Sequence, residues 1–257
     1  MTLAPDPSAV AERFSAAAET YDAAAAVQRH AADALTARLP AGRDVREMVD
    51  LGCGTGLLTA ALLRRYPGAR VTGLDMAEGM VARCRERWPE HSFAVADAVT
   101  APARPADLVA SSFALHWMPD GPGVLGRWAA ALPPGGLVAA CVPLPGSLDA
   151  LAGAYRRQTG RPWPGIAYPA AATYRNAVRG AGATPIADAE TALTQQCPDA
   201  LAALRTLRAL GATARRPDAG RPASVGALRR ALAAYADADG SATLTFRVLI
   251  LVAEKGA

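Results

Sequence analysis

Three closely spaced glycines, Gly52, Gly54 and Gly56, follow an apolar run that begins at Val49, and no other stretch constrains the fold as strongly. Glycine tolerates the positive φ angles that a sharp turn from a strand into a helix requires. It also leaves the backbone bare, so that a bulky ligand can approach the N–H groups at the start of the helix. The stretch predicts a strand, a tight turn and a helix built around a nucleotide-like ligand.

The spacing of these glycines discriminates between nucleotide ligands. In the dinucleotide fingerprint the third glycine stands three residues after the second, but that position is Leu57 here and the glycine comes one residue early. S-adenosylmethionine has no pyrophosphate to place at a helix N-terminus, and it carries a carboxylate, an ammonium and a ribose instead. We therefore expect S-adenosylmethionine as the cofactor, with S-adenosylhomocysteine as its product, rather than NAD.

An acidic residue at the end of the next predicted strand strengthens this expectation. The strand covers 70–75, and Asp75 ends it nineteen positions after Gly56, where a carboxylate can accept hydrogen bonds from both ribose hydroxyls. Asp75 is therefore the predicted ribose-binding residue. Asp50 near the end of the first strand has two open interpretations: an ordinary strand-end residue, or a residue close to the ammonium of the ligand.

Other cofactor-binding candidates follow from their positions at strand ends, where open α/β sheets bind ligands. Met76 is expected to cover one face of the adenine. Asp97 follows a strand predicted at 91–96, and its carboxylate together with the backbone amide of Ala98 is expected to read the adenine edge. Ser112 ends the fourth predicted strand and completes this set.

Alternating strands and helices predict an α/β fold with a doubly wound, mostly parallel sheet. After the first strand, further strands are predicted at 70–75, 91–96, 106–112, 137–142, 184–195 and 242–253. Helices over 8–20 and 22–39 precede the first strand, and the helices after the fifth strand are interpreted as an inserted lid. The predicted parts of this single domain are a helical cap at 1–40, a cofactor-binding core at 44–145, acceptor and lid helices with the sixth strand at 146–240, and the final strand at 241–257.

Composition excludes several other classes of protein. The chain has 257 residues, enough for a substantial core but short for two full domains, and with 51% hydrophobic and 19% charged residues it should be folded. No apolar run is long enough to cross a bilayer, and the first residues lack the pattern of an export signal. We therefore expect a cytoplasmic enzyme with no membrane partner.

Charge and cysteine usage argue against metals and nucleic acid. The four cysteines are far apart without paired spacing, and the chain has three histidines, so that a metal site is not expected. The net charge is +4, but the basic residues are not interleaved with aromatic residues in a manner that suggests base stacking. We expect no nucleic-acid partner, and an assembly no larger than a monomer or weak dimer.

Three large side chains are candidates for the acceptor side. Tyr21 lies between the two N-terminal helices, where it is either a catalytic residue over the pocket or a packing residue. His116 and Trp117 follow the fourth strand, where the methyl donor should meet its acceptor. His116 is interpreted as a general base or as a neutral lining residue, and Trp117 as pocket wall.

Several short motifs extend from the N-terminal helices to the last strand. They are Arg13-Phe14-Ser15-Ala16-Ala17 with Tyr21-Asp22 and Gln28, the segment Ser111 to Trp117, Gly146-Ser147-Leu148, the run Leu204 to Ala212, and Leu244-Thr245-Phe246. Together they resemble the malonyl-[acyl-carrier-protein] O-methyltransferases of biotin synthesis. The chain departs from that family at 161–169, where Pro162-Trp163-Pro164-Gly165 stands in place of an expected polar histidine or asparagine.

The resemblance implies a Rossmann-like class I methyltransferase that transfers a methyl group to the free carboxylate of malonyl carried on acyl carrier protein. That carboxylate is ionised at neutral pH, so that alignment and desolvation suffice for the reaction without a strong base. An arginine should orient it, and the candidates are Arg205, Arg208 and Arg247, each with a solvated surface charge as the alternative.

Two other functions stay open on the sequence. A methyltransferase for a free small acid, of the aconitate type, shares the fold and the glycine turn, but it needs several basic groups inside its pocket. A carrier-linked acceptor needs a basic rim around a channel instead. The second alternative is a non-catalytic partner protein that binds S-adenosylmethionine without turnover.

Overall fold

The computed structural model describes residues 6–212 and 220–256, and the strands within them form one seven-stranded sheet. The strands are β1 (Glu47–Leu51), β2 (Arg70–Asp75), β3 (Ser92–Val95), β4 (Leu108–Ser112), β5 (Leu137–Pro143), β6 (Ala183–Cys197) and β7 (Ala242–Lys255). Their order is β3-β2-β1-β4-β5-β7-β6. The first five strands pair in parallel, whereas β7 is antiparallel to both β5 and β6. The expected α/β class with a mostly parallel sheet is confirmed.

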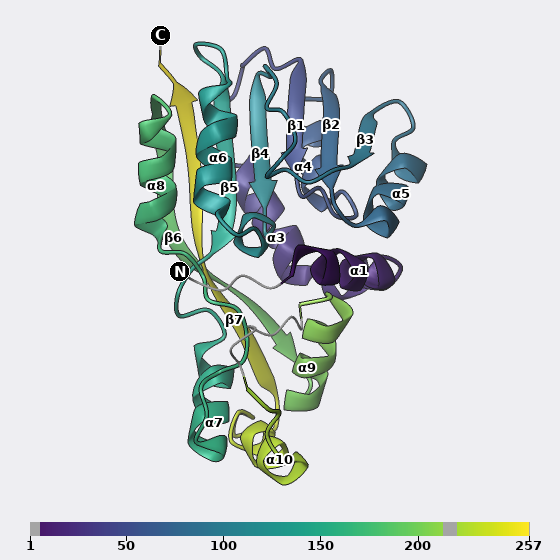
Figure 1. Cartoon of the computed structure of the whole chain (residues 1–257), viewed down its shortest axis with the longest axis vertical. Helices are drawn as coiled ribbons and strands as arrows, with labels where there is room; N and C mark the ends of the chain where they lie inside the picture. Colours follow the sequence, from purple (N-terminus) through teal and green to yellow (C-terminus); the bar gives the residue numbers. More distant parts are fainter. Residues whose placement is uncertain (1–5, 213–219, 257) are drawn as a thin grey trace.

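Helices cover both faces of the sheet (Figure 1). They are α1 (Pro7–Ala17), α2 (Tyr21–Ala24), α3 (Ala26–Thr36), α4 (Leu57–Arg65), α5 (Glu78–Arg87), α6 (Gly121–Ala130), α7 (Asp149–Thr159), α8 (Ala171–Gly180), α9 (Ala200–Ala209) and α10 (Val225–Ala233), with a 3-10 turn η1 (Leu115–Trp117). Leu35 of α3 and Leu62 of α4 belong to the core on one face. Trp128 of α6 and Tyr174 of α8 belong to the core on the other face. Successive strand residues alternate between the two cores, because neighbouring side chains point to opposite faces.

α1 lies at the carboxyl ends of the parallel strands and runs across them (Figure 1), whereas α3, which also belongs to the cap expected at 1–40, packs on one face of the sheet beside α4. Asp6 caps α1, because its Oδ1 accepts a hydrogen bond from the Ser8 N–H at 3.1 Å. The single helix expected over 22–39 is wrong: α2 ends and α3 begins around Ala25, whose ψ of 42° is not helical. This break allows Asp22 to face the glycine turn, as the contacts below show.

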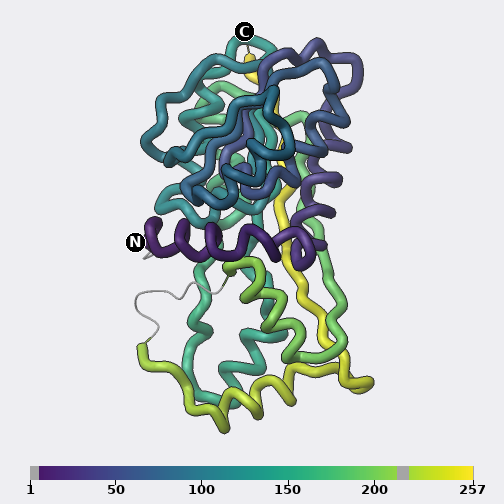
Figure 2. Tube along the Cα trace, turned by 90° about the vertical axis from the view of Figure 1, so that its right-hand side faces the viewer, coloured from purple at the N-terminus to yellow at the C-terminus, as the bar shows by residue number. Residues whose placement is uncertain are grey.

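The two longest strands, β6 and β7, extend beyond the other strands, and α7, α9 and α10 gather around their far ends (Figures 1 and 2). We call these three helices and the strand ends the lower lobe. In Figure 2, α1 lies between the lower lobe and the rest of the sheet. The expected lid region at 146–240 also contains α8, but α8 packs beside α6 because its buried residues Ala171, Tyr174 and Val178 form one apolar stripe.

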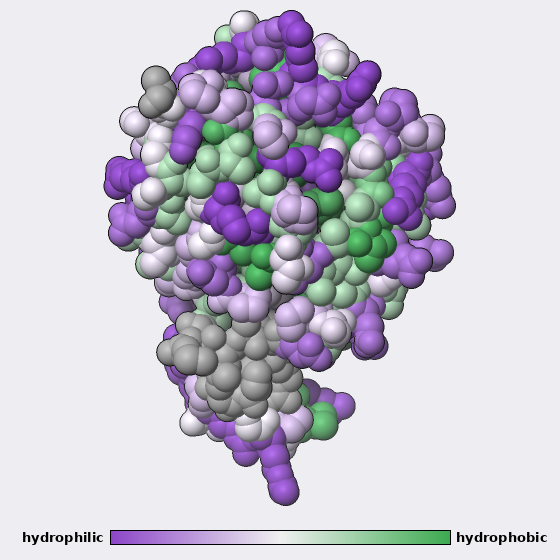
Figure 3. Space-filling view, turned by 45° about the horizontal axis from the view of Figure 1, so that its top comes forward, coloured by the Kyte–Doolittle hydropathy of each residue, from purple (hydrophilic) through white to green (hydrophobic). Residues whose placement is uncertain are grey.

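Hydrophilic residues cover much of the face seen in Figure 3, with hydrophobic patches between them. Among the described helices, none combines the length and the apolar character that a membrane span requires. The four cysteines are buried and free.

Candidate functional site

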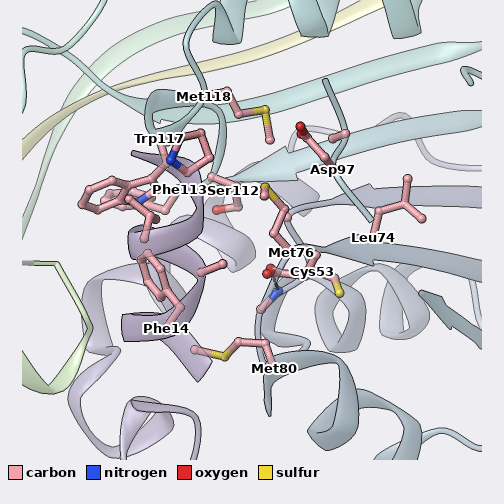
Figure 4. A pocket seen from close by; sticks show the side chains of 18 of the residues that line it. Phe14, Cys53, Leu74, Met76, Met80, Asp97, Ser112, Phe113, Trp117 and Met118 are labelled. Atoms are coloured by element: carbon pink, nitrogen blue, oxygen red, sulfur yellow. Dashed lines mark hydrogen bonds between the residues drawn. The ribbon is translucent and has the colours of Figure 1, made fainter. Parts of the chain in front are cut away.

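A pocket lies at the carboxyl ends of β1, β2 and β4, and we call it the sheet-edge pocket. Figure 4 shows that Leu74 and Asp97 approach it from the strand ends, while Phe14 of α1 lies opposite. Phe113 and Trp117, which follow β4, form part of the remaining wall. Open α/β sheets bind ligands at this location, because the loops after adjacent strands diverge there.

The three glycines make the predicted turn from β1 into α4. Their φ angles are 70° at Gly52, 54° at Gly54 and 89° at Gly56, all in the left-handed region that favours glycine. A Cβ atom at Gly52 would lie 2.2 Å from the Cβ of Ala114, and one at Gly56 would lie 2.3 Å from the ring of Trp88. A Cβ at Gly54 would meet no protein atom within 4 Å, because Gly54 borders the open pocket. Gly52 and Gly56 therefore serve packing, and Gly54 leaves room for a ligand.

The carboxylate of Asp75 is held beside this turn. Leu51 of β1 pairs with Leu74 of β2, so that the residues that follow the two strands are neighbours. One carboxylate oxygen accepts a hydrogen bond from the Gly54 N–H at 2.9 Å, and the other accepts one from the Ala77 N–H at 2.8 Å. Burial raises the pKa of Asp75, and the backbone N–H groups oppose that shift. Its place on the pocket wall is compatible with ribose binding, which remains a prediction.

Asp50 lies behind the turn and not on the wall of the pocket. It is fully buried, and one of its carboxylate oxygens accepts a hydrogen bond from the Thr59 hydroxyl at 2.7 Å. Its other oxygen has no hydrogen-bond partner within the described residues. Burial raises the pKa of Asp50 to about 7. The side chain links β1 to α4, and this favours the structural interpretation over contact with a ligand ammonium.

The structure brings the other cofactor candidates together. Met76, Asp97, Ala98 and Ser112 all border the sheet-edge pocket. The carboxylate of Asp97 accepts a hydrogen bond from the Val99 N–H at 2.8 Å, and this holds it at the end of β3. The buried hydroxyl of Ser112 has no hydrogen-bond partner within the described residues. An unpaired buried hydroxyl is costly, which is consistent with a polar ligand in the pocket.

The pocket has chemical groups that suit S-adenosylmethionine. Asp75 offers a carboxylate for the ribose, Gly54 leaves space at the backbone, and Met76 offers an apolar, polarizable surface for the adenine. Within the described residues, no three His, Cys, Asp or Glu side chains are placed to hold a metal ion.

A polar latch joins the N-terminal cap to the glycine turn. Asp22 accepts hydrogen bonds from the Thr55 hydroxyl and from the Arg87 guanidinium, both at 2.5 Å. Arg87 also donates to the Thr55 carbonyl at 2.9 Å. Thr55 and Arg87 were not predicted as site residues, because a contact between α2, the turn and the end of α5 leaves no local sequence pattern. Tyr21, the residue before Asp22, borders the sheet-edge pocket.

A second cavity adjoins the sheet-edge pocket, and we call it the aromatic cavity. Five residues border both: Phe14, Tyr21, Gln28, Phe113 and Trp117. The other described residues of its wall come from η1, the loop before α8 and the lower lobe, and include His116, Leu148, Trp163, Gly165, Ile166, Tyr168, Leu207, Leu210, Ala212 and Phe246. The shared wall is where a donor in one space and an acceptor in the other would meet.

Of the two predicted catalytic side chains, Tyr21 borders both cavities and His116 borders the aromatic cavity, and burial sets the protonation state of each. Burial lowers the pKa of His116 to about 3, so that its imidazole is neutral near pH 7 and is a weak base. Burial, with help from the nearby Asp75 and Asp22 carboxylates, raises the pKa of Tyr21 above its ordinary value. The Tyr21 hydroxyl therefore stays protonated and can donate a hydrogen bond. The general-base interpretation of His116 is disfavoured, and the neutral lining interpretation is favoured.

The three predicted carboxylate-binding arginines do not border either cavity. Arg205 and Arg208 are exposed on α9, on the other side of that helix from Leu207. Arg247 on β7 is more than half exposed, and its guanidinium lies 3.8 Å from the Glu190 carboxylate. Helical and strand periodicity directs these long side chains to solvent. The expectation that one of them holds the acceptor carboxylate inside the site is not supported by this geometry.

The buried imidazole makes a testable contribution to stability. His116 binds a proton in the unfolded chain below pH 6.5 but in the folded chain only near pH 3, so that acidification favours unfolding. Between pH 7 and pH 5, His116 should lower the free energy of unfolding by about 2 kcal/mol. Urea unfolding of the wild type and of His116→Gln at both pH values measures this loss. Asp50 and Asp75 titrate in both proteins, so that only the difference between the two proteins reports on His116. An equal loss of unfolding free energy in the wild type and in His116→Gln would contradict a neutral buried His116.

Comparison with known proteins identifies the family. Residues 48–136 match the family described as a methyltransferase domain, a range that includes the glycine turn, Asp75, Asp97 and Ser112. The chain is 32% identical over 252 residues to a malonyl-[acyl-carrier protein] O-methyltransferase of Salmonella typhimurium, which covers 96% of this chain and 97% of that protein. It is 44% identical over 114 residues to a trans-aconitate 2-methyltransferase of Variovorax paradoxus, and the chain spans 44% of the length of that relative.

Solved structures share the fold at low sequence identity. The YcgJ protein of Bacillus subtilis has a TM-score of 0.60 and 11% identity, covering 89% of this chain and 99% of that protein. The geranyl diphosphate C-methyltransferase of Streptomyces coelicolor, solved with S-adenosyl-L-homocysteine, has a TM-score of 0.53 and 15% identity over 87% of this chain and 77% of that protein. With the family match, the relative of full length and the sheet order, these findings show that the chain belongs to the class I S-adenosylmethionine-dependent methyltransferases.

Proposed function

We propose that this protein methylates the free carboxylate of malonyl-[acyl-carrier protein], an early step in making the pimeloyl part of biotin. The observation that carries the proposal is the similarity to the Salmonella typhimurium malonyl-[acyl-carrier protein] O-methyltransferase over almost the whole of both chains. The trans-aconitate 2-methyltransferases of Variovorax paradoxus and Methylobacterium nodulans are higher in identity, but each of these two matches covers less than half of either chain.

The extent of each match bears on the acceptor. Phe14 and Phe246 both border the aromatic cavity, although 232 positions separate them in the sequence. An alignment of 252 residues spans such a site, whereas one of 114 residues does not. The longer match therefore covers the elements that would recognise an acceptor, and the shorter match covers only part of them.

The chemistry of the aromatic cavity also favours a malonyl group over trans-aconitate. Among the described residues, the polar side chains on its wall are neutral: Tyr21, Gln28, His116 and Tyr168. Three carboxylates on one small ligand would need several opposite charges to offset their desolvation, whereas a malonyl group brings one carboxylate on an otherwise uncharged chain. Trans-aconitate remains the second candidate acceptor, because the chain is more identical to trans-aconitate methyltransferases over the part that aligns with them.

The proposed reaction needs orientation more than proton transfer. When bound, S-adenosylmethionine supplies an activated methyl group. The chain excludes water from the junction with Phe113 and Trp117, which are largely buried, and desolvation of the acceptor oxygen raises its reactivity. The Tyr21 side chain borders both cavities, and its protonated hydroxyl can donate a hydrogen bond to a bound group. A carboxylate acceptor is already ionised, so that a neutral His116 is no obstacle to the reaction.

Exposed arginines beside the aromatic cavity suit an acidic carrier protein. Leu207 of α9 borders the cavity, and Arg205 and Arg208 lie on the exposed side of the same helix. Positive side chains near a cavity increase the rate of encounter with a negatively charged partner and contribute less to the final affinity. We assign these arginines to carrier docking in place of carboxylate binding.

Methyl transfer from labelled S-adenosylmethionine tests the proposal directly. Malonyl carrier protein, acetyl carrier protein, malonyl-CoA and trans-aconitate are supplied at equal concentration. We expect label on malonyl carrier protein, at least about tenfold less on trans-aconitate, and none on acetyl carrier protein, which has no free carboxylate. Label mainly on trans-aconitate would replace the proposal with the second candidate. Cofactor binding without label on any acceptor would favour a non-catalytic binding protein.

A further inference from the structure

Two buried polar atoms, in side chains that border the aromatic cavity, have no hydrogen-bond partner within the described residues. They are the Oε1 of Gln28 and the Nδ1 of His116, and each of these residues is only 9% exposed. Unpaired polar atoms in such positions are rare in folded proteins, because they have lost their hydrogen bonds to water. Because both residues border one cavity, a polar ligand group there could complete their hydrogen bonding after a small side-chain rotation.

The surroundings hold both side chains close to the junction with the sheet-edge pocket. Gln28 borders both cavities. The His116 ring lies 5.0 Å from the Trp117 ring and 5.6 Å from the Tyr168 ring, measured between centroids, and it meets Phe113 edge to face at 6.1 Å. Aromatic neighbours on several sides orient the imidazole and exclude water from it. A polar ligand group here would be bound in a low-dielectric environment.

We propose that Gln28 and His116 bind the acceptor carboxylate through neutral hydrogen bonds, and that its charge is balanced by the cofactor sulfonium instead of an arginine. The inference rests on the proposed function, because it assumes a carboxylate acceptor. A glutamine side chain can present either its oxygen or its NH₂ group, because its terminal amide can rotate by about 180°. A neutral imidazole has one N–H donor. Both side chains can therefore donate to a carboxylate.

A neutral anchor has a physical advantage for this chemistry. Transfer of a methyl group from a sulfonium to a carboxylate removes one positive and one negative charge, so that a low-dielectric site favours the reaction. A fixed guanidinium beside the carboxylate would stabilise the charged ground state and would lose its partner as the ester forms. Neutral donors hold the oxygen in place without this penalty. The affinity for the acceptor should then depend on the charge of the bound cofactor.

Calorimetry with two unreactive cofactor analogues tests the dependence on charge. The full-length protein is saturated with one of two analogues. S-adenosylhomocysteine is neutral at sulfur, whereas in sinefungin a carbon atom that bears a positively charged amine replaces the methylated sulfur. Malonyl carrier protein is then titrated into each complex. We expect at least about tenfold tighter binding to the sinefungin complex, whereas acetyl carrier protein should bind both complexes equally.

The outcomes separate the inference from the proposed function. Equal affinities of malonyl carrier protein for the two complexes, both tighter than for acetyl carrier protein, would overturn the neutral anchor and leave the function standing. If malonyl carrier protein binds neither complex more tightly than acetyl carrier protein does, the proposed function is overturned, and the inference with it.

Substitutions at His116 identify the anchoring group. His116→Leu removes the donor, and we expect the preference for malonyl over acetyl carrier protein to fall at least about tenfold in the sinefungin complex. His116→Asn keeps a neutral donor and should restore most of that preference. A purely structural role would change the affinities for both carrier proteins alike, and unchanged preference in His116→Leu would overturn the role of His116.

Discussion

Replacing Asp75 with alanine is expected to lower the affinity for S-adenosylmethionine at least about a hundredfold, which corresponds to about 3 kcal/mol. The substitution removes the predicted acceptor for the ribose hydroxyls. It also leaves the N–H groups of Gly54 and Ala77 without their side-chain acceptor, because both donate to the Asp75 carboxylate. The wall of the sheet-edge pocket would lose both a ligand contact and the group that orders its backbone.

Asp107 provides a matched control for this substitution. One of its carboxylate oxygens accepts hydrogen bonds from the N–H groups of Arg46 and Glu47, at 2.8 and 2.9 Å, at the other end of β1. Asp107→Ala should therefore lower the stability comparably but leave cofactor affinity within about twofold of the wild type. Calorimetric titration with S-adenosylhomocysteine and thermal unfolding of both variants measure the two effects. Wild-type affinity in folded Asp75→Ala would remove the ribose assignment.

Alanine at Gly52 is expected to destabilise the fold by about 3 kcal/mol, a decrease in Tm on the order of 6–12 °C for a chain of this size. The residue has a φ of 70°, and its new Cβ would lie 2.2 Å from the Cβ of Ala114. The segment after β4 would have to move away from the turn. That segment contains Phe113 and Trp117, which form the wall shared by the two cavities, so that methyl transfer should also fall sharply.

Gly54→Ala is the paired variant that separates backbone strain from packing. Its φ of 54° imposes a similar conformational cost, about 1–2 kcal/mol, but the new Cβ would meet no protein atom within 4 Å. We expect Gly54→Ala to lower the Tm less than Gly52→Ala does. For each degree of Tm lost, however, Gly54→Ala should weaken cofactor binding more, because its new methyl group would occupy ligand space. Equal decreases in Tm for the two variants would show that the contact with Ala114 has no energetic effect.

Local sequence signals predicted the core of this protein because each depends on short-range physics. The glycines at 52, 54 and 56 predicted the turn, since their positive φ angles are a property of single residues. Continuous apolar runs predicted the central strands to within a few residues, because a strand buried on both faces of a sheet needs apolar side chains at successive positions. The position of Asp75 followed from the strand that it ends, and the structure places it on the pocket wall.

Predictions that needed a spatial neighbour were less successful. Arg205, Arg208 and Arg247 were expected to hold a carboxylate, but their charges face solvent, because an arginine in a sequence carries no sign of which side of its helix or strand faces the site. Asp50 stands one position before Leu51 at the end of β1, yet its side chain points behind the turn to Thr59. Strand alternation decides this direction, and the choice of face depends on what packs there.

The sequence by itself thus determined the fold class, the ligand end of the sheet and the residues around the glycine turn, since these follow from φ angles and from apolar periodicity. Tertiary structure alone decided that Asp22 reaches Thr55 and Arg87, that α8 joins α6, and that Gln28 and His116 border one cavity. The reason is that these relations join residues far apart in the chain, and their energies come from burial and hydrogen bonds that exist only after the elements have packed.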